Sequence, residues 1–187
     1  MESPERDQTA LVVLVPEAES LVGEFRRKFD ISAMQGLGAH VTILFPFKPP
    51  EQLSVDVLAD LRALFAAQPR FKFSLSSVDG FPSVVFLAPE PAAPFERLTR
   101  ATAARYPDCP PYGGAFTETI PHLTVAQRPP AENLDQVADR VRSSIEPLLP
   151  VACSADEVSL AVRRTNRWSI AERFHLHRGS DAVRTRR

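Results

Sequence analysis

The sequence predicts a single domain of mixed helices and strands that is built from two similar halves. The length of 187 residues suits one domain. Apolar runs with strand character alternate with amphipathic stretches, and the order strand, helix, strand, helix, strand occurs twice. Each copy also contains a histidine and a threonine two places apart at the start of an apolar strand, as His40 and Thr42 and again as His122 and Thr124.

The first copy begins with an apolar run that Pro16 ends, as expected for a buried strand. The next stretch carries Leu21, Phe25 and Phe29 at four-residue spacing, which indicates an amphipathic helix. Ser54 has the side chain of a helix N-cap. The elements expected in this copy are, in order, a strand at 10–16, a helix at 17–29, a strand at 40–47 after a glycine loop, a helix after Ser54 and a half-buried strand at 71–78.

The second copy repeats this order, and the same residues mark the ends of its elements. An apolar run is closed by Pro-Glu, and a glycine loop precedes the strand with the histidine. The elements expected are, in order, a strand within 80–90 that begins after the Asp79-Gly80 turn, a helix from Pro94, a loop at 110–116, a strand at 120–127, a helix capped by Asn133, and two strands within 156–177 around a turn near Thr165 and Asn166. The copies differ in spacing, which a loop insertion explains, so we interpret them as an internal duplication.

Composition narrows the function classes. The chain is 44% hydrophobic and 24% charged, with a formal net charge of -1. This balance argues against a large nucleic-acid-binding surface but leaves a small anionic substrate or an RNA end open. Two cysteines without paired spacing suggest free thiols, and the polar N-terminus lacks a secretion signal, so we expect a cytoplasmic monomer with no membrane segment. Residues 1–178 are expected to form one domain of two duplicated lobes, and 179–187 a disordered basic tail.

The two histidine–threonine pairs predict a phosphodiester site. Successive side chains of a strand point to opposite faces, so His40 shares a face with Thr42, and His122 shares one with Thr124. A single such histidine is more often structural, but two equivalent pairs related by a pseudo-twofold axis would line one cleft. Histidine can act as base or acid near neutral pH, and threonine hydroxyls can donate hydrogen bonds to phosphoryl oxygens. No metal is needed, because the protein supplies both proton transfers.

These tandem motifs resemble the signature of the 2H phosphoesterase superfamily, which includes 2′-5′ RNA ligase and cyclic phosphodiesterase proteins. The resemblance extends from about Thr9 to His177. It implies an α+β fold with two lobes, in which two antiparallel sheets flanked by helices surround a central cleft. It also implies opening of 2′,3′-cyclic or related cyclic phosphates of nucleotides or RNA ends, with both histidines catalytic, both threonines binding phosphate and no cofactor. Pseudo-symmetry leaves open which histidine is the base and which the acid.

Further residues could bind the substrate, each with a simpler structural explanation. The phenylalanines could stack a nucleobase or pack in the core, and the arginines around the last hairpin could hold a second phosphate or lie in solvent. The tyrosine could lie on a mobile lip of the cleft or in a plain loop, and the tryptophan resembles an aromatic residue of the superfamily's final strand. These candidates are Phe45, Phe47, Tyr112, Arg163, Arg164, Arg167 and Trp168.

Three alternatives compete with hydrolysis. The first is 2′-5′ RNA ligation, which is the same phosphodiester chemistry in reverse. The second is a module that binds phosphorylated RNA ends without turnover, although a pure binder has no need of two titratable groups. The third is a metal site at His175 and His177, which share a strand face but have no third ligand nearby in the sequence.

Overall fold

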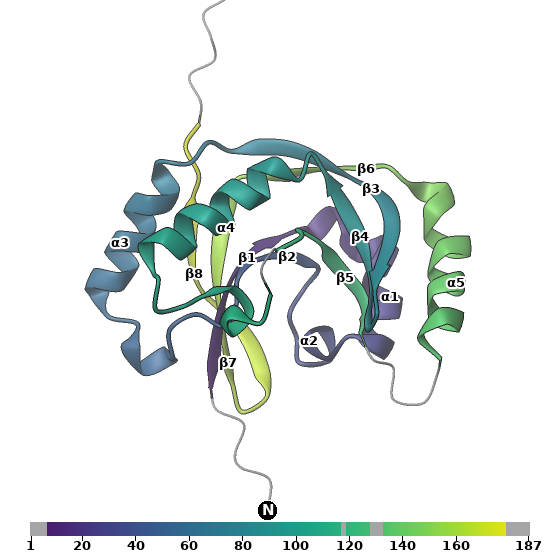
Figure 1. The fold of residues 1–187 in the computed structure, drawn as a ribbon, viewed down its shortest axis with the longest axis horizontal. Helices are drawn as coiled ribbons and strands as arrows, with labels where there is room; N and C mark the ends of the chain where they lie inside the picture. The colour runs from purple at the N-terminus through teal and green to yellow at the C-terminus, as the bar shows by residue number, and fades with distance from the viewer. Residues whose placement is uncertain (1–6, 117–118, 128–132, 179–187) are drawn as a thin grey trace, which may run out of the picture.

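The structure is a computed structural model that describes residues 7–116, 119–127 and 133–178 (Figure 1). The described strands form one sheet in which every strand pairing is antiparallel, in the order β6-β3-β4-β5-β2-β1-β7-β8. Their bounds are β1 (Gln8–Leu14), β2 (His40–Leu44), β3 (Phe71–Phe81), β4 (Val84–Glu90), β5 (Leu123–Gln127), β6 (Val151–Ala155), β7 (Glu157–Arg164) and β8 (Arg167–His175).

The helices lie outside the curled sheet (Figure 1). They are α1 (Glu19–Phe29), α2 (Ile31–Met34), α3 (Val55–Ala66), α4 (Ala93–Arg105) and α5 (Leu134–Ile145), with short 3-10 segments η1 (Pro16–Ala18), η2 (Pro50–Gln52), η3 (Pro111–Gly114) and η4 (Glu146–Leu148). Within the described part of the chain, none of the helices is long and apolar enough to cross a membrane.

The predicted class of mixed helices and strands is confirmed, but the expected division into two sheets is not. The two halves of the sheet join where β2 pairs with β5, and that junction has a single register pair, Val41 with Leu123. The strands that carry the histidine–threonine pairs therefore lie side by side at the middle of one sheet. The sequence could not show this junction, because it depends on a contact between strands about eighty residues apart.

Each half contributes elements to the other. The third strand of the first copy, β3, pairs with β4 of the second copy, whereas β7 pairs with β1. The helices cross over in the same way, since α1 packs against β5 and α4 packs against β2. The main hydrophobic core therefore lies between the sheet and its helices and contains residues from both copies. The opposite face of β1, β2 and β5 is left for the site.

Several local predictions are confirmed. Ser54 caps α3, because its side-chain oxygen accepts a hydrogen bond from the amide of Val57 at 3.2 Å. The Asn133 side chain caps α5 in the same way, at 2.8 Å from the amide of Asp135. The turn between β7 and β8 is formed by two residues with positive φ, Thr165 and Asn166, as a tight antiparallel hairpin requires.

Other boundaries differ from the prediction. The turn before β4 lies at Pro82 and Ser83, because Gly80 is still paired with Val85 and proline lacks the N–H that a strand ladder needs. For the same reason β2 ends at Leu44, ahead of Pro46, instead of running to residue 47. Helix α2 and strand β6 were not predicted. The predicted tail, 179–187, lies outside the described residues.

Candidate active site

The two central strands place both histidine–threonine pairs on one face. His40 is the first residue of β2, and His122 immediately precedes β5. Val41 and Leu123 are fully buried in the main core, while the histidines and threonines are only half-buried, so the predicted alternation is present. The two imidazoles are close enough that a charge on His122 lowers the pKa of His40.

Each imidazole is held by its own backbone in the same way. The Nδ1 atom of His40 lies 2.8 Å from the carbonyl oxygen of Gly38, and Nδ1 of His122 lies 2.7 Å from that of Ile120. Because a carbonyl only accepts hydrogen bonds, Nδ1 must donate in both cases. The neutral rings therefore keep an unprotonated Nε2, the nitrogen that can take or return a proton.

Burial lowers the pKa values of both histidines, but charged neighbours act on His40 alone. Burial lowers the pKa of His40 to about 4, with a further contribution from the positive charge of Arg26, against opposing effects of the Gly38 carbonyl and of Asp30. Burial also lowers the pKa of His122, and its hydrogen bond to Ile120 opposes that shift.

Three of the predicted substrate-binding residues come together beside His40. The rings of Phe45 and Trp168 meet edge to face, with centroids 6.4 Å apart. The guanidinium of Arg163 lies over Trp168, 5.9 Å from the ring centroid. Both rings pack on a small apolar cluster that includes Val12, the register partner of Thr42. This face therefore offers an aromatic surface next to the first histidine–threonine pair.

Tyr112 also comes to the site. Its backbone amide donates to the carbonyl of Phe45 at 2.6 Å, and its side chain is hydrogen-bonded to that of Thr42. Burial raises the pKa of the Tyr112 phenol, and the bond to Thr42 partly opposes this shift. The loop reaches this position through positive φ angles at Tyr112 and at the two glycines that follow it.

The other predicted residues do not join this face. Phe47 is buried in the main core and contacts the ring of Tyr106 edge to face at 5.0 Å. It leaves the His40 face because the strand ends before Pro46. Arg164 and Arg167 pair with each other across the hairpin, one position out of step with Arg163 and Trp168, so they point to the opposite side of it.

The structure adds residues that the sequence reasoning missed. The ring of His122 contacts two phenylalanines, Phe81 at 5.2 Å and Phe86 at 5.3 Å between centroids. Phe86 is the register partner of Thr124, a pairing that no sequence pattern displays. On the other side, Arg26 lies near His40. The helix periodicity could have indicated Arg26, because it follows Val22 by four residues and therefore lies on the same, inward face of α1.

Within the described part of the chain, the alternative metal site at His175 and His177 receives no third ligand. Nδ1 of His175 lies 3.7 Å from a carboxylate oxygen of Glu157, and the backbone of His177 pairs with that of residues 68 and 70. Among the described residues, no group of three or more histidine, cysteine, aspartate or glutamate side chains could hold a metal ion.

Solved structures with the same fold include complexes of E. coli LigT with nucleotides and a protein described as a phosphoesterase. E. coli LigT complexed with NADP+ is 17% identical with a TM-score of 0.59, and the alignment covers 93% of this chain and 99% of that one. E. coli LigT complexed with 3′-AMP is 15% identical with a TM-score of 0.58 over 93% and 100%. TT0787 of Thermus thermophilus is 21% identical with a TM-score of 0.59 over 92% and 99%. The fold of this chain is thus the one that E. coli LigT has.

Sequence comparison assigns the family. The family model of the 2′-5′ RNA ligase superfamily matches residues 14–167, which include both histidine–threonine pairs. The chain therefore belongs to the 2′-5′ RNA ligase superfamily of 2H phosphoesterases, a membership that supports an enzyme of this kind. No curated protein matches the chain by sequence at a significant level.

Proposed function

We propose that this protein opens 2′,3′-cyclic, or related cyclic, phosphates of nucleotides or RNA ends by acid–base catalysis with His40 and His122. The observation that carries the proposal is the pair of imidazoles on neighbouring strands, each with Nδ1 bound to its own backbone and Nε2 left for proton transfer. Each histidine is followed two residues later by a threonine on the same face.

The reaction balances with these groups alone. Nε2 of one histidine takes a proton from water as the water oxygen attacks phosphorus. The bond between phosphorus and the 2′ or 3′ oxygen of the ribose breaks, and the other histidine, protonated at Nε2, gives its proton to that oxygen. Thr42 and Thr124 donate hydrogen bonds to the non-bridging oxygens, whose charge rises in the transition state. One histidine accepts a proton and the other donates one, so the proposed reaction requires no metal or cofactor.

The nucleoside would lie on the His40 side of the site. The edge-to-face pair of Phe45 and Trp168 gives a nucleobase a ring to stack on, and Arg163 lies within reach of a further phosphate. The similar structures support a nucleotide substrate, because E. coli LigT has been solved with 3′-AMP, ATP and NADP+.

A second candidate function is 2′-5′ RNA ligation, which the description of the matching family favours. Ligation uses the same ring-opening step with a different nucleophile. A ribose hydroxyl replaces water in the attack on the cyclic phosphate, and one histidine takes the proton of that hydroxyl. The other histidine gives its proton to the 3′ oxygen as the bond of that oxygen to phosphorus breaks, which leaves a 2′-5′ linkage.

The test is to incubate the protein with 2′,3′-cyclic nucleotides, with and without 2′-5′-linked oligonucleotides, in the presence of a chelator. We expect opening of the cyclic phosphate by the parental protein and loss of turnover in a His40→Ala, His122→Ala double variant. His175→Ala, which removes an exposed histidine outside the site, is the matched control. Binding of the nucleotide with no product would instead favour a non-catalytic module, and parental rates in the double variant would refute the site.

A further inference from the structure

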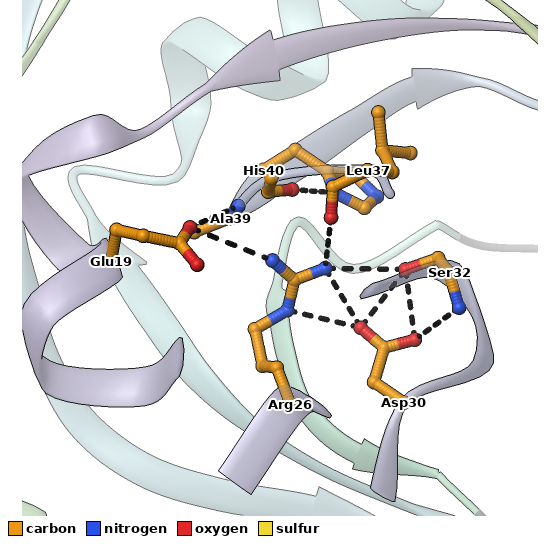
Figure 2. Close-up of polar contacts among 8 residues, drawn as sticks. Glu19, Arg26, Asp30, Ser32, Leu37, Ala39 and His40 are labelled. Carbon is orange, nitrogen blue, oxygen red and sulfur yellow. Dashed lines mark hydrogen bonds and ion pairs between the residues drawn. The ribbon is translucent and has the colours of Figure 1, made fainter. Parts of the chain in front are cut away.

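A buried ion pair lies beneath His40 (Figure 2). Arg26 in α1 and Asp30, the residue after that helix, are 1% and 2% exposed. Nε and Nη2 of Arg26 donate to the same carboxylate oxygen of Asp30 at 3.0 and 2.8 Å. The other oxygen of Asp30 accepts from the backbone amide of Ser32 at 2.9 Å, so the carboxylate is satisfied on both sides.

This pair is connected to the backbone that leads into β2. Nη2 of Arg26 donates to the carbonyl of Leu37 at 3.2 Å. Glu19, whose carboxylate lies 4.0 Å from Nη1 of Arg26, accepts from the amide of Ala39 at 2.8 Å. Gly38 lies between these two anchored residues, and its carbonyl is the one that holds Nδ1 of His40. The Gly38 carbonyl that orients the ring thus lies between two anchored residues, Leu37 and Ala39, whose contacts Figure 2 shows.

Stability alone gives little reason for such a pair in the interior. Removing a guanidinium and a carboxylate from water costs about as much as their attraction returns, and apolar side chains of similar size often serve a core as well. In addition, Nη1 of Arg26 is buried and makes no hydrogen bond to a described residue. A buried positive charge near an imidazole does have a specific effect, because it disfavours protonation of that ring.

The second histidine has different surroundings. Ile120 holds its Nδ1 as Gly38 holds that of His40, but the rings of Phe81 and Phe86 lie against His122. Among the described residues, the charged and titratable groups that act on the protonation of His40 are Arg26, Asp30 and His122, whereas His122 shows only the effects of burial and of its backbone bond.

We propose that Arg26 is a positioning residue for His40, which fixes the Gly38 carbonyl through Leu37 and, with Glu19, through Ala39, and whose charge makes the two histidines unequal. The inference rests on the proposed function, since it assigns a role within that same site. Acid–base catalysis by a pair of like groups needs one protonated and one neutral at the same time, and unequal surroundings separate them. The inequality originates in α1, outside the repeated motif.

The first test replaces the pair by neutral side chains. In an Arg26→Met, Asp30→Asn double variant no charge is left unpaired in the core. The asparagine side-chain oxygen can still accept the hydrogen bond from the amide of Ser32. NMR titration of the imidazole Cε1–H signals should show a raised pKa of His40, because the lowering effect of Arg26 that is removed is larger than the raising effect of Asp30 that is removed with it. The pKa of His122 should be nearly unchanged. With a 2′,3′-cyclic nucleotide, kcat should fall about tenfold or more while KM stays within about twofold.

A charge-conserving variant separates the two parts of the proposal. Arg26→Lys keeps the positive charge but cannot reach Asp30 and Leu37 with the same planar fork. We expect the pKa of His40 to stay low in this variant while kcat still falls. The matched control is Arg105→Met, Asp60→Asn, which removes a hydrogen-bonded arginine–aspartate pair between α4 and α3. Its His40 titration and its kcat should be those of the parental protein.

If the double variant does not fold, a variant of Glu19 tests whether the contacts to Leu37 and Ala39 position the Gly38 carbonyl. Its side chain borders a cavity of about 510 Å³ and is half-exposed, so truncation leaves no unpaired charge in the core. Glu19→Ala frees the Ala39 amide and should lower kcat by about threefold to tenfold, and Glu19→Gln, which can still accept that hydrogen bond, should restore it. A parental kcat in Glu19→Ala would contradict the proposal that Glu19 helps to position the Gly38 carbonyl.

The two proposals fail separately. The titrations need no substrate, so an unchanged pKa of His40 in the double variant, together with kcat within about twofold of the parental value, overturns the role of Arg26 whatever the enzyme acts on. Conversely, a protein that opens no cyclic phosphate but whose His40 titration responds to Arg26 refutes the proposed function and retains the unequal histidines.

Discussion

The two histidine sites share their local structure and differ in their neighbours. In both rings Nδ1–H donates a hydrogen bond to the carbonyl oxygen two residues earlier. Both histidines are followed by a threonine on the same strand face. Behind His40 lies the charged frame of Arg26 and Asp30, whereas His122 lies against aromatic rings. A repeated motif therefore determines the orientation of a side chain, while tertiary neighbours from elsewhere in the chain determine its proton affinity.

The largest loss of activity should follow from replacing either histidine. His40→Ala and His122→Ala should each lower kcat by about 10³-fold, and the double variant should be little worse, because an acid and a base that act together are strongly non-additive. Steady-state rates with one cyclic nucleotide at fixed pH give the comparison. Strictly multiplicative losses would show that the two rings do not act in the same step.

The threonines test whether both sides bind the phosphate. Thr42→Val and Thr124→Val keep the shape but remove the donor, and each should lower kcat by about 10- to 100-fold. Tyr112→Phe removes the hydrogen bond to Thr42 and should change the rate much less, since the hydroxyl of Thr42 remains. An effect of Thr42→Val alone would mean that the phosphate lies against only one of the two strands.

The lowered pKa of His40 predicts an acid-sensitive fold. Because the folded protein holds this ring neutral down to about pH 4, its contribution to stability is fully present above the ordinary pKa of 6.5 and is lost as the pH falls toward 4. Urea unfolding of the parental protein should show this loss between pH 6.5 and 4. The curve of His40→Ala should be flatter over the same range, and parallel curves for the two proteins would contradict the shift.

The smallest effect concerns the aromatic side of the comparison. Phe81 is only partly buried, and Phe81→Ala should let water reach His122 and raise its pKa by a few tenths of a unit toward its ordinary value. The pKa of His40 should not move, and NMR titration of both rings measures each in one experiment. Equal shifts of the two rings would mean that one common environment controls both.

Much of the local structure was predictable. Helix caps at Ser54 and Asn133, the turn at Thr165 and Asn166, and the strand faces of both motifs depend on residues close in sequence. The errors in the bounds of β2 and β4 arose at prolines, where a missing N–H interrupts a strand, and the early end of β2 carried Phe47 from the expected site into the core. The sequence left open whether Phe45 and Trp168 stack a nucleobase or pack in the core, and the structure brings their rings together edge to face.

The sequence by itself determined the two histidine–threonine pairs, their strand faces and the family, because period-two alternation and short motifs are local properties of a chain. Only the tertiary structure decided that the two strands join in one sheet, that Arg26 lies under one histidine and two phenylalanines lie against the other. The physical reason is that burial and Coulomb interactions act through space. Groups that set the proton affinity of a ring need not be near it in the sequence.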